Sequence, residues 1–97
     1  MNDPEIFRAQ VDTLFLVQHD ADRIELRLVD VADERVGRGI QQFSLLFHGP
    51  ADRALSQGTH EFHHGALGSL SLFIVPVVGS NHERIVYQAC FSRPAPA

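Results

Sequence analysis

Apolar and polar residues alternate along most of this chain with a period of two. The clearest case is RIELRLVDV, residues 23–31, in which an isoleucine and two leucines share one face while charged residues occupy the other. Because successive side chains of a β-strand point to opposite faces, the pattern predicts a strand with one buried face. The apolar phase slips between Leu28 and Val29, which predicts a bulge or a sharp bend within this strand.

The same kind of pattern predicts five further strands, separated by turn-forming residues. The strands are expected at 13–17, 41–48, 59–64, 67–77 and 83–93. The connections are expected at 19–22, at 32–39 as a polar turn with two glycines, at 49–58 as a long loop with glycine at both ends, and at 78–82. Pro76, near the end of its strand, suits an edge or terminal position rather than a central one.

The N-terminal residues differ from this pattern and predict a short helix. Asp3 can cap the first turn, Pro4 needs no hydrogen-bonded N–H there, and Glu5 places a negative charge near the helix N-terminus. Four residues could then lie along one side of the helix: Ile6, Phe7, Gln10 and Val11.

These elements predict an all-β fold, a small six-stranded antiparallel barrel or sandwich opened by a short N-terminal helix. Either architecture covers most of the sheet edges. Consecutive strands are expected to be hairpin partners. The chain of 97 residues suits one domain, which we expect to cover residues 1–93, with 94–97 as a disordered tail.

Composition and charge narrow the function classes. The net charge is −4, and the eight basic residues, all arginines, are scattered singly, which disfavours nucleic acid as a partner. The longest apolar run, residues 72–78, is too short to span a membrane, and no secretory signal is visible. A cytoplasmic protein without membrane contact is therefore the expectation.

The stretch THEFHH contains the strongest candidate ligands. Strand alternation places His60 and His64 on one face, roughly 13 Å apart, and that separation is too large for one metal ion. Glu61 and His63 share the other face at about 6.5 Å by backbone rise. With His48 from the preceding strand they could form a site of two histidines and one carboxylate.

A plainer interpretation of the same residues is a structural one, and we favour it. In that interpretation His60 and His64 flank Phe62 at the edge of the core, while Glu61 and His63 form part of a solvated face. A third alternative is a ligand or partner surface that uses the imidazoles for hydrogen bonding and stacking. The stretch also lacks the His-x-His spacing of metal-binding cupin barrels. We therefore assign no metal site and no cofactor.

Catalytic motifs are absent from the sequence as well. None of the serines lies in a Gly-x-Ser-x-Gly elbow. Cys90 is the only cysteine, and its place in an apolar segment predicts a small buried side chain. No catalytic residue is therefore assigned, and the protein is not expected to be an enzyme.

Several segments together resemble a family of short bacterial proteins classed as a domain of unknown function. The resemblance covers roughly residues 4–93. Its most specific pieces are FSLLF at 43–47 before Gly49-Pro50, QGT at 57–59, and Leu67-Gly68 followed by Phe73 and Pro76-Val77. The resemblance implies a genetic neighbourhood of phage-tail-collar-like proteins and implies no catalytic residue.

The sequence thus favours a non-enzymatic interaction or assembly module, an accessory of a phage-tail-like particle. A protein partner or self-association is expected, and Arg53 and Arg93 are candidate contacts. The alternative is a small-molecule or metal-binding, cupin-like barrel that uses His48, Glu61 and His63.

Overall fold

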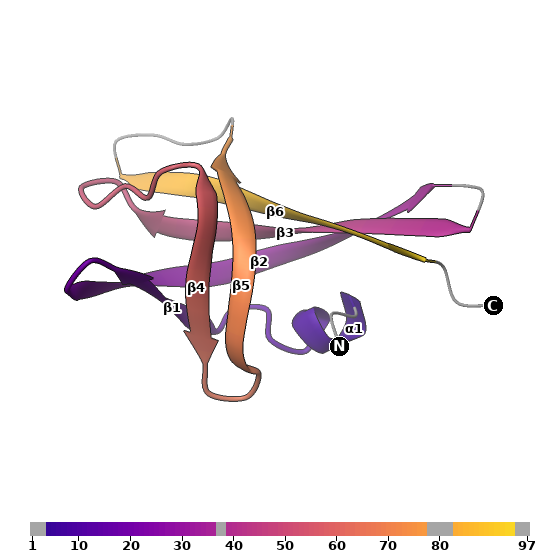
Figure 1. Ribbon diagram of the computed structural model, residues 1–97, viewed down its shortest axis with the longest axis horizontal. Coiled ribbons are helices and arrows are strands. Elements are labelled where there is room, and N and C mark those ends of the chain that lie inside the picture. Colours follow the sequence, from indigo (N-terminus) through magenta and orange to yellow (C-terminus); the bar gives the residue numbers. More distant parts are fainter. Residues whose placement is uncertain (1–3, 37–38, 78–82, 95–97) are drawn as a thin grey trace.

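A computed structural model gives the fold of the chain (Figure 1). It describes residues 4–36, 39–77 and 83–94, with 33–36, 93 and 94 as backbone only. The elements are α1 (Pro4–Arg8), β1 (Leu14–His19), β2 (Asp22–Val36), β3 (Ile40–Pro50), β4 (Gly58–His64), β5 (Gly68–Pro76) and β6 (Arg84–Pro94). The six antiparallel strands and the short N-terminal helix confirm the predicted fold class.

The strands form a closed barrel in the order β1-β2-β3-β6-β5-β4, rather than a sandwich. The barrel closes where β1 pairs with β4, through Leu16 with His63 and Val17 with Phe62. Most consecutive strands are hairpin partners, as expected, but β3 and β4 are not neighbours. The last strand, β6, lies between β3 and β5, so the connection after β3 has to cross one end of the barrel.

The inward-facing side chains fill the barrel. Phe15, Phe47 and Phe62 are fully buried, with ring centroids 5.3 to 6.4 Å apart. The buried core consists of inward-facing strand residues together with Phe7 of α1 and Leu55 of the loop after β3: Phe7, Phe15, Val17, Ile24, Leu26, Leu28, Val31, Phe43, Leu45, Phe47, Leu55, Phe62, Leu72, Ile74, Tyr87 and Ala89. The interior is therefore a packed hydrophobic core, as expected for a barrel of few strands.

The predicted bulge in β2 is confirmed, because the pairing with β3 shifts register between Leu28 and Asp30. The predicted polar turn at 32–39 is wrong over most of its length. β2 continues to Val36 and pairs with β3 as far as Ile40. Charged residues can occupy this strand because it lies outside the barrel, where pairing with β3 supports its backbone.

Three strands extend beyond the barrel as a ribbon-like projection (Figure 1). We call residues 32–36 of β2, 40–44 of β3 and 90–94 of β6 the arm, because over these residues β3 pairs with β2 on one side and with β6 on the other. The arm helps to make the molecule elongated, 43 × 28 × 22 Å. α1 lies against the inner face of the arm. Its Phe7 contacts Phe43 and Phe91, whose rings stack at 4.7 Å.

Several predicted boundaries move by one or two residues. Gly49 and Pro50 belong to β3 and Gly58 to β4, so the loop is shorter than expected. β6 ends at Pro94, one residue past the predicted domain boundary. Pro76 ends β5, which confirms its predicted terminal position. The expected cap Asp3, the connection at 78–82 and residues 95–97 lie outside the described residues.

The helix is too short to cross a membrane, and no other described segment is a helix long and apolar enough to do so.

Candidate functional site

The three candidate metal ligands do not come together. Glu61 and His63 lie on β4, with side-chain atoms 3.9 Å apart, whereas His48 lies on β3. Two strands separate β3 from β4 in either direction around the barrel, or about 14 Å at the usual strand spacing. All three residues alternate with buried ones and so point outward. Within the described part of the chain, no three His, Cys, Asp or Glu side chains are grouped to hold a metal ion.

The two faces of β4 follow the structural interpretation of the histidine stretch. Phe62 is fully buried, and His60 and His64 on the same face are half-buried at the two ends of the barrel wall. Glu61 is exposed and His63 is partly exposed on the outer face. The ring of His60 contacts the Ser56 carbonyl oxygen at 2.8 Å, so this histidine fastens the loop that precedes β4.

His64 is the most constrained of the imidazoles. Its Nδ1 accepts hydrogen bonds from the N–H groups of Ala66 and Leu67, at 3.0 and 3.3 Å. A nitrogen that accepts carries no proton, so the Nε2–H donates to the Thr13 hydroxyl at 2.8 Å. The Thr13 hydroxyl in turn donates to the Gln10 carbonyl oxygen at 2.7 Å. The neutral ring thus joins the turn after β4 to the segment between α1 and β1.

Burial lowers the pKa of His64 below its ordinary value of 6.5. The ring also packs on Phe15 with centroids 4.3 Å apart, which removes water from one side. Protonation of Nδ1 would place an N–H against the two N–H groups that it now accepts. The site is therefore a structural hydrogen-bonding centre that requires a neutral imidazole.

The sequence did not link His63 with Ser69, which lies directly opposite it on β5. Ser69 Oγ is 3.1 Å from His63 Nδ1, and Glu61 lies on the other side of the imidazole. These residue types match a Ser–His–acid set, but they lie on an open outer face exposed to water. Catalysis by such a set depends on exclusion of water and on donors aimed at a developing oxyanion. We therefore regard the group as surface hydrogen bonding.

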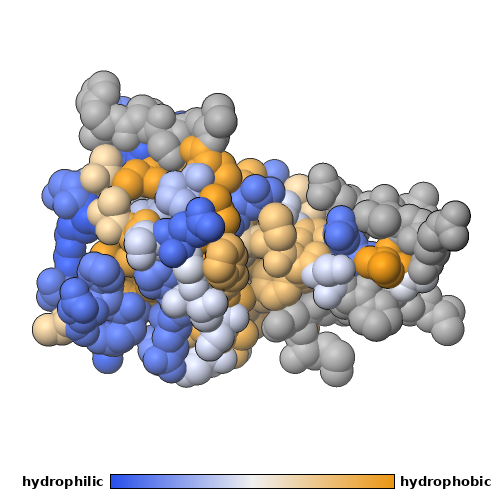
Figure 2. Space-filling model, turned by 45° about the horizontal axis from the view of Figure 1, so that its top comes forward, coloured by the Kyte–Doolittle hydropathy of each residue, from blue (hydrophilic) through white to orange (hydrophobic). Residues whose placement is uncertain are grey.

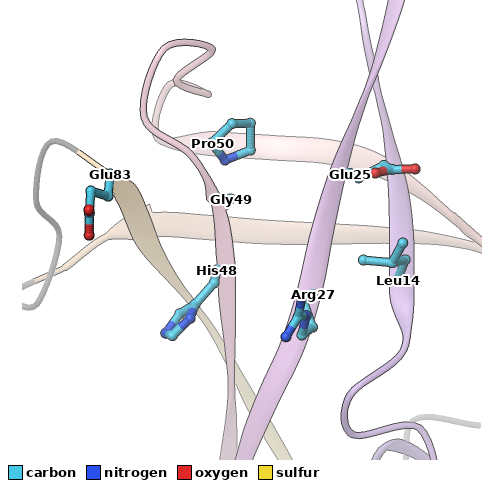
Figure 3. Close-up of a pocket in the computed structure, with 7 residues that line it drawn as sticks. All are labelled: Leu14, Glu25, Arg27, His48, Gly49, Pro50 and Glu83. Carbon is cyan, nitrogen blue, oxygen red and sulfur yellow. The ribbon is translucent and has the colours of Figure 1, made fainter.

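A shallow hollow surrounds His48 on the outer surface (Figure 3). His48 and Arg27 lie on neighbouring strands and on the same face of the sheet, since the two residues are paired across β3 and β2. Leu14 on β1 continues the row, and Glu83 lies on the far side of His48. Burial and the positive charges of Arg84 and Arg27 lower the pKa of His48, so it is neutral at pH 7.

The sequence also predicted a buried Cys90 and named Arg53 and Arg93 as candidate contacts. The prediction that Cys90 is buried is wrong, because Cys90 is exposed on the outer face of β6 while its neighbour Ala89 points into the core. An apolar run does not by itself reveal which residues of a strand face inward. Arg53 forms an ion pair with Asp22 at 3.0 Å, and the side chain of Arg93 lies outside the described part.

Apolar surface is concentrated away from the polar end of the barrel. Hydrophilic residues dominate the end opposite the arm, and hydrophobic residues form a band between that end and the arm (Figure 2). Among the described residues, four large hydrophobic side chains are exposed: Ile6, Leu14, Ile40 and Phe73. Phe73 is the most exposed, at 53%, although it lies in the middle of β5.

The geometry defines a small closed β-barrel with a packed interior and a projecting three-stranded arm. The chain matches the family model described as Domain of unknown function (DUF6916) over residues 3–91, so it belongs to that family. This confirms that the resemblance was to a family of unknown function. Comparisons with curated proteins and with solved structures find no match.

Proposed function

We propose that this protein is a non-enzymatic assembly module that binds other protein chains, and that it is an accessory of a phage-tail-like particle. The arm is the observation that carries the proposal. Its outer strands, β2 from Asp30 and β6 from Phe91, pair with β3 on one side only, within the described residues. An unpaired strand edge offers a row of N–H and C=O groups to the strand of another chain.

The contrast with the barrel supports this assignment. Around the barrel, closure pairs each strand with a neighbour on both sides and removes free edges. An arm that extends past the closed part contributes little to the core, apart from the contacts of Phe7, Phe43 and Phe91. A long strand pair that projects from a small core is well suited to contact a neighbouring subunit.

The distribution of polar groups supports a binding role rather than catalysis. The barrel interior is filled by apolar side chains, and His48, Glu61 and His63 point outward from different parts of the wall. The phage-tail part of the proposal rests on the sequence resemblance alone, which implies a genetic neighbourhood of phage-tail-collar-like proteins. Assembly in the cytoplasm, without nucleic acid or membrane, belongs to the same proposal.

The test is capture of particle proteins by the immobilised chain from a lysate of its native host. Mass spectrometry should identify structural proteins of a tail-like particle among the retained chains. The double variant Cys90→Lys/Ser92→Lys places charge on the outer face beside the β6 edge and should reduce their retention at least tenfold, about the effect of 1.4 kcal/mol.

The matched control adds the same two charges away from the arm. Gln18→Lys/Ser56→Lys changes exposed residues at the other end of the barrel and should leave retention unchanged. Retention of no particle protein, or equal retention by both double variants, would contradict the proposal.

A further inference from the structure

Arg27 and His48 form a cross-strand pair of nitrogen donors on the outer wall of the barrel. They are directly opposite each other in the β2–β3 ladder, and both line the shallow hollow around His48, whose volume is about 350 Å³ (Figure 3). Within the described part of the chain, neither side chain has an ion pair or a hydrogen bond with another residue. The hollow therefore presents a guanidinium and an imidazole to solvent without a protein acceptor.

Positive charge flanks His48 from the strands on both sides. His48 pairs with Arg27 of β2, and Pro50, two residues further along the same face of β3, pairs with Arg84 of β6. After burial, the charges of Arg84 and Arg27 are the causes that lower the pKa of His48. An anion placed beside these groups would offset their repulsion and favour the protonated imidazole.

Carboxylates also border this face, and they limit the charge that the hollow can accept. Glu25 and Glu83 line the hollow, and Asp30 lies further along β2, opposite Leu46. Among the described residues, none of the three forms an ion pair with Arg27. Their negative charge repels a phosphate with two charges more strongly than a carboxylate with one. The balance of charges therefore favours a singly charged anion.

Apolar surface lies next to the two donors. Leu14 of β1 is paired with Arg27 and is 49% exposed, although it lies on the wall of a closed barrel. Pro50 follows His48 by two residues on the same face of β3, and both Leu14 and Pro50 line the hollow. Because binding sites combine apolar walls with a few polar groups that fix orientation, the hollow suits an anion attached to an aliphatic group.

We propose that the hollow between Arg27 and His48 binds a carboxylate attached to a short aliphatic group. The Arg27 guanidinium is a planar fork that matches the two oxygens of a carboxylate, and the imidazole of His48 adds a further N–H. Leu14 and Pro50 cover the aliphatic group. A free short-chain acid and the C-terminal residue of a polypeptide both offer this chemistry.

N-acetyl-leucine tests the site, and N-acetyl-leucinamide is the matched control because it lacks the carboxylate. NMR follows the imidazole signal of His48, which the variant His48→Gln identifies among the signals of the six histidines. Because the hollow is open and the probe is small, a dissociation constant on the order of a few millimolar is expected. The acid should shift the signal saturably and raise the pKa of His48. The amide should leave the signal unchanged up to about 50 mM, well above that constant.

A pair of arginine variants tests the geometry. Arg27→Gln removes the guanidinium and should weaken binding of N-acetyl-leucine about fivefold, the effect of losing one partly exposed ion pair. Arg23→Gln is the matched control, since Arg23 is an exposed residue on the same face of β2, four residues from Arg27 and outside the hollow. It should bind like the unmodified chain. Circular dichroism and the unfolding midpoint confirm that both variants are folded.

Two further probes examine the rest of the ligand. N-acetylglycine keeps the carboxylate without the aliphatic group and should bind about threefold to tenfold more weakly, because less apolar surface is buried on Leu14 and Pro50. The peptide N-acetyl-glycyl-glycyl-leucine distinguishes the two sources of the carboxylate. Tighter binding than that of N-acetyl-leucine identifies the C-terminus of a polypeptide, and equal binding identifies a free acid. Either result supports the inference.

Several outcomes would overturn the inference. One is the absence of a saturable shift of the His48 signal, and another is the same shift with the acid and the amide. Equal weakening by Arg27→Gln and Arg23→Gln would reveal a general effect of charge rather than a site. Inorganic phosphate that binds as tightly as N-acetyl-leucine would contradict the choice of a carboxylate. The inference goes beyond the proposed function and uses no residue of the arm, so capture of particle proteins can fail or succeed independently of it.

Discussion

The barrel and the arm share three long strands, β2, β3 and β6, and differ in how these strands are covered. In the barrel, inward residues such as Phe47 and Leu45 are completely buried and each strand has two neighbours. In the arm, Phe7 of α1 covers one face, and among the residues that the structure describes each outer strand pairs with β3 alone. The difference shows that one strand can line the core at one end and, within the described residues, lack a neighbour on one side at the other.

Removal of a phenylalanine ring should destabilise the protein much more in the barrel than in the arm, and this is the largest difference expected between the two regions. Phe47→Ala removes a fully buried ring that contacts Phe15 and Phe62, and should lower the free energy of unfolding by about 3–5 kcal/mol. Phe91→Ala in the arm removes a partly buried ring and should cost roughly half as much. Urea unfolding of the two variants measures both losses of free energy. Equal losses would mean that the arm is as much a part of the cooperative core as the barrel.

Crowding inside the barrel is tested at Gly49. A methyl group added there would meet the side chain of Leu26 and lie 3.1 Å from the ring of Tyr87. Gly49→Ala should therefore cost about 1–3 kcal/mol through overpacking. Gly65→Ala is the control, since nothing lies within 4 Å of its added methyl group. If Gly49→Ala left the free energy of unfolding unchanged, the barrel wall would have to relax around the added methyl group.

A buried hydrogen bond joins the loop after β3 to the barrel. The Leu55 N–H donates to the Tyr87 hydroxyl at 2.8 Å, and both residues are almost fully buried. Tyr87→Phe leaves this N–H without its acceptor and should destabilise the fold by about 1–3 kcal/mol. Burial raises the pKa of Tyr87, so the hydroxyl stays protonated through neutral pH. Loss of amide protection at Leu55 alone, measured by hydrogen exchange, would localise the effect to the loop.

The neutral His64 predicts a pH dependence with a defined sign. Its folded-state pKa lies below 6.5, so the unfolded chain takes up a proton first as the pH falls. Stability should be fully retained above about pH 6.5 and decline below it. His48, whose pKa is also lowered, adds a loss of the same sign. Unfolding midpoints at pH 7.5 and 5.5 measure the decline.

The pH dependence should be attributable to these two residues. His64→Gln and His48→Gln should each reduce the difference between the two midpoints, and the double variant should reduce it further. A His64→Gln variant with the full difference would show that its imidazole is not the titrating group.

The smallest effect is expected on the outer face of the barrel. His63→Ala removes a contact with Ser69 on an open surface and should change the free energy of unfolding by less than about 0.5 kcal/mol. A loss comparable with that of Phe91→Ala would mean that the Glu61, His63 and Ser69 group is more than surface hydrogen bonding.

The sequence predicted the strands where burial enforces strict alternation and failed where it does not. The strand that starts at Arg23 and the slip after Leu28 could be identified because the barrel buries one face. Residues 32–36 were assigned to a turn because their polar character gives no periodicity outside the core. Cys90 was misplaced because neighbouring Ala89 and Cys90 are both small and apolar, so their order does not reveal the inward face.

For the site, alternation alone separated the faces of β4 correctly. It placed Phe62 with His60 and His64, and it separated them from Glu61 and His63. It could not show that two strands lie between His48 and His63, because strand order depends on contacts between distant segments. The bonds of His64 to Thr13 and the contact of His63 with Ser69 were also invisible, since no sequence spacing encodes a partner on another strand.

The sequence by itself therefore determined the all-β class, the short helix, the bulge and the two faces of each strongly alternating strand, because these depend on local backbone geometry and on the burial of neighbouring residues. Only the tertiary structure decided that the sheet closes as a barrel, that β6 inserts between β3 and β5, and that β2, β3 and β6 continue past the barrel as the arm. The physical reason is that strand neighbours and free edges are set by long-range pairing, which a single strand's pattern does not contain.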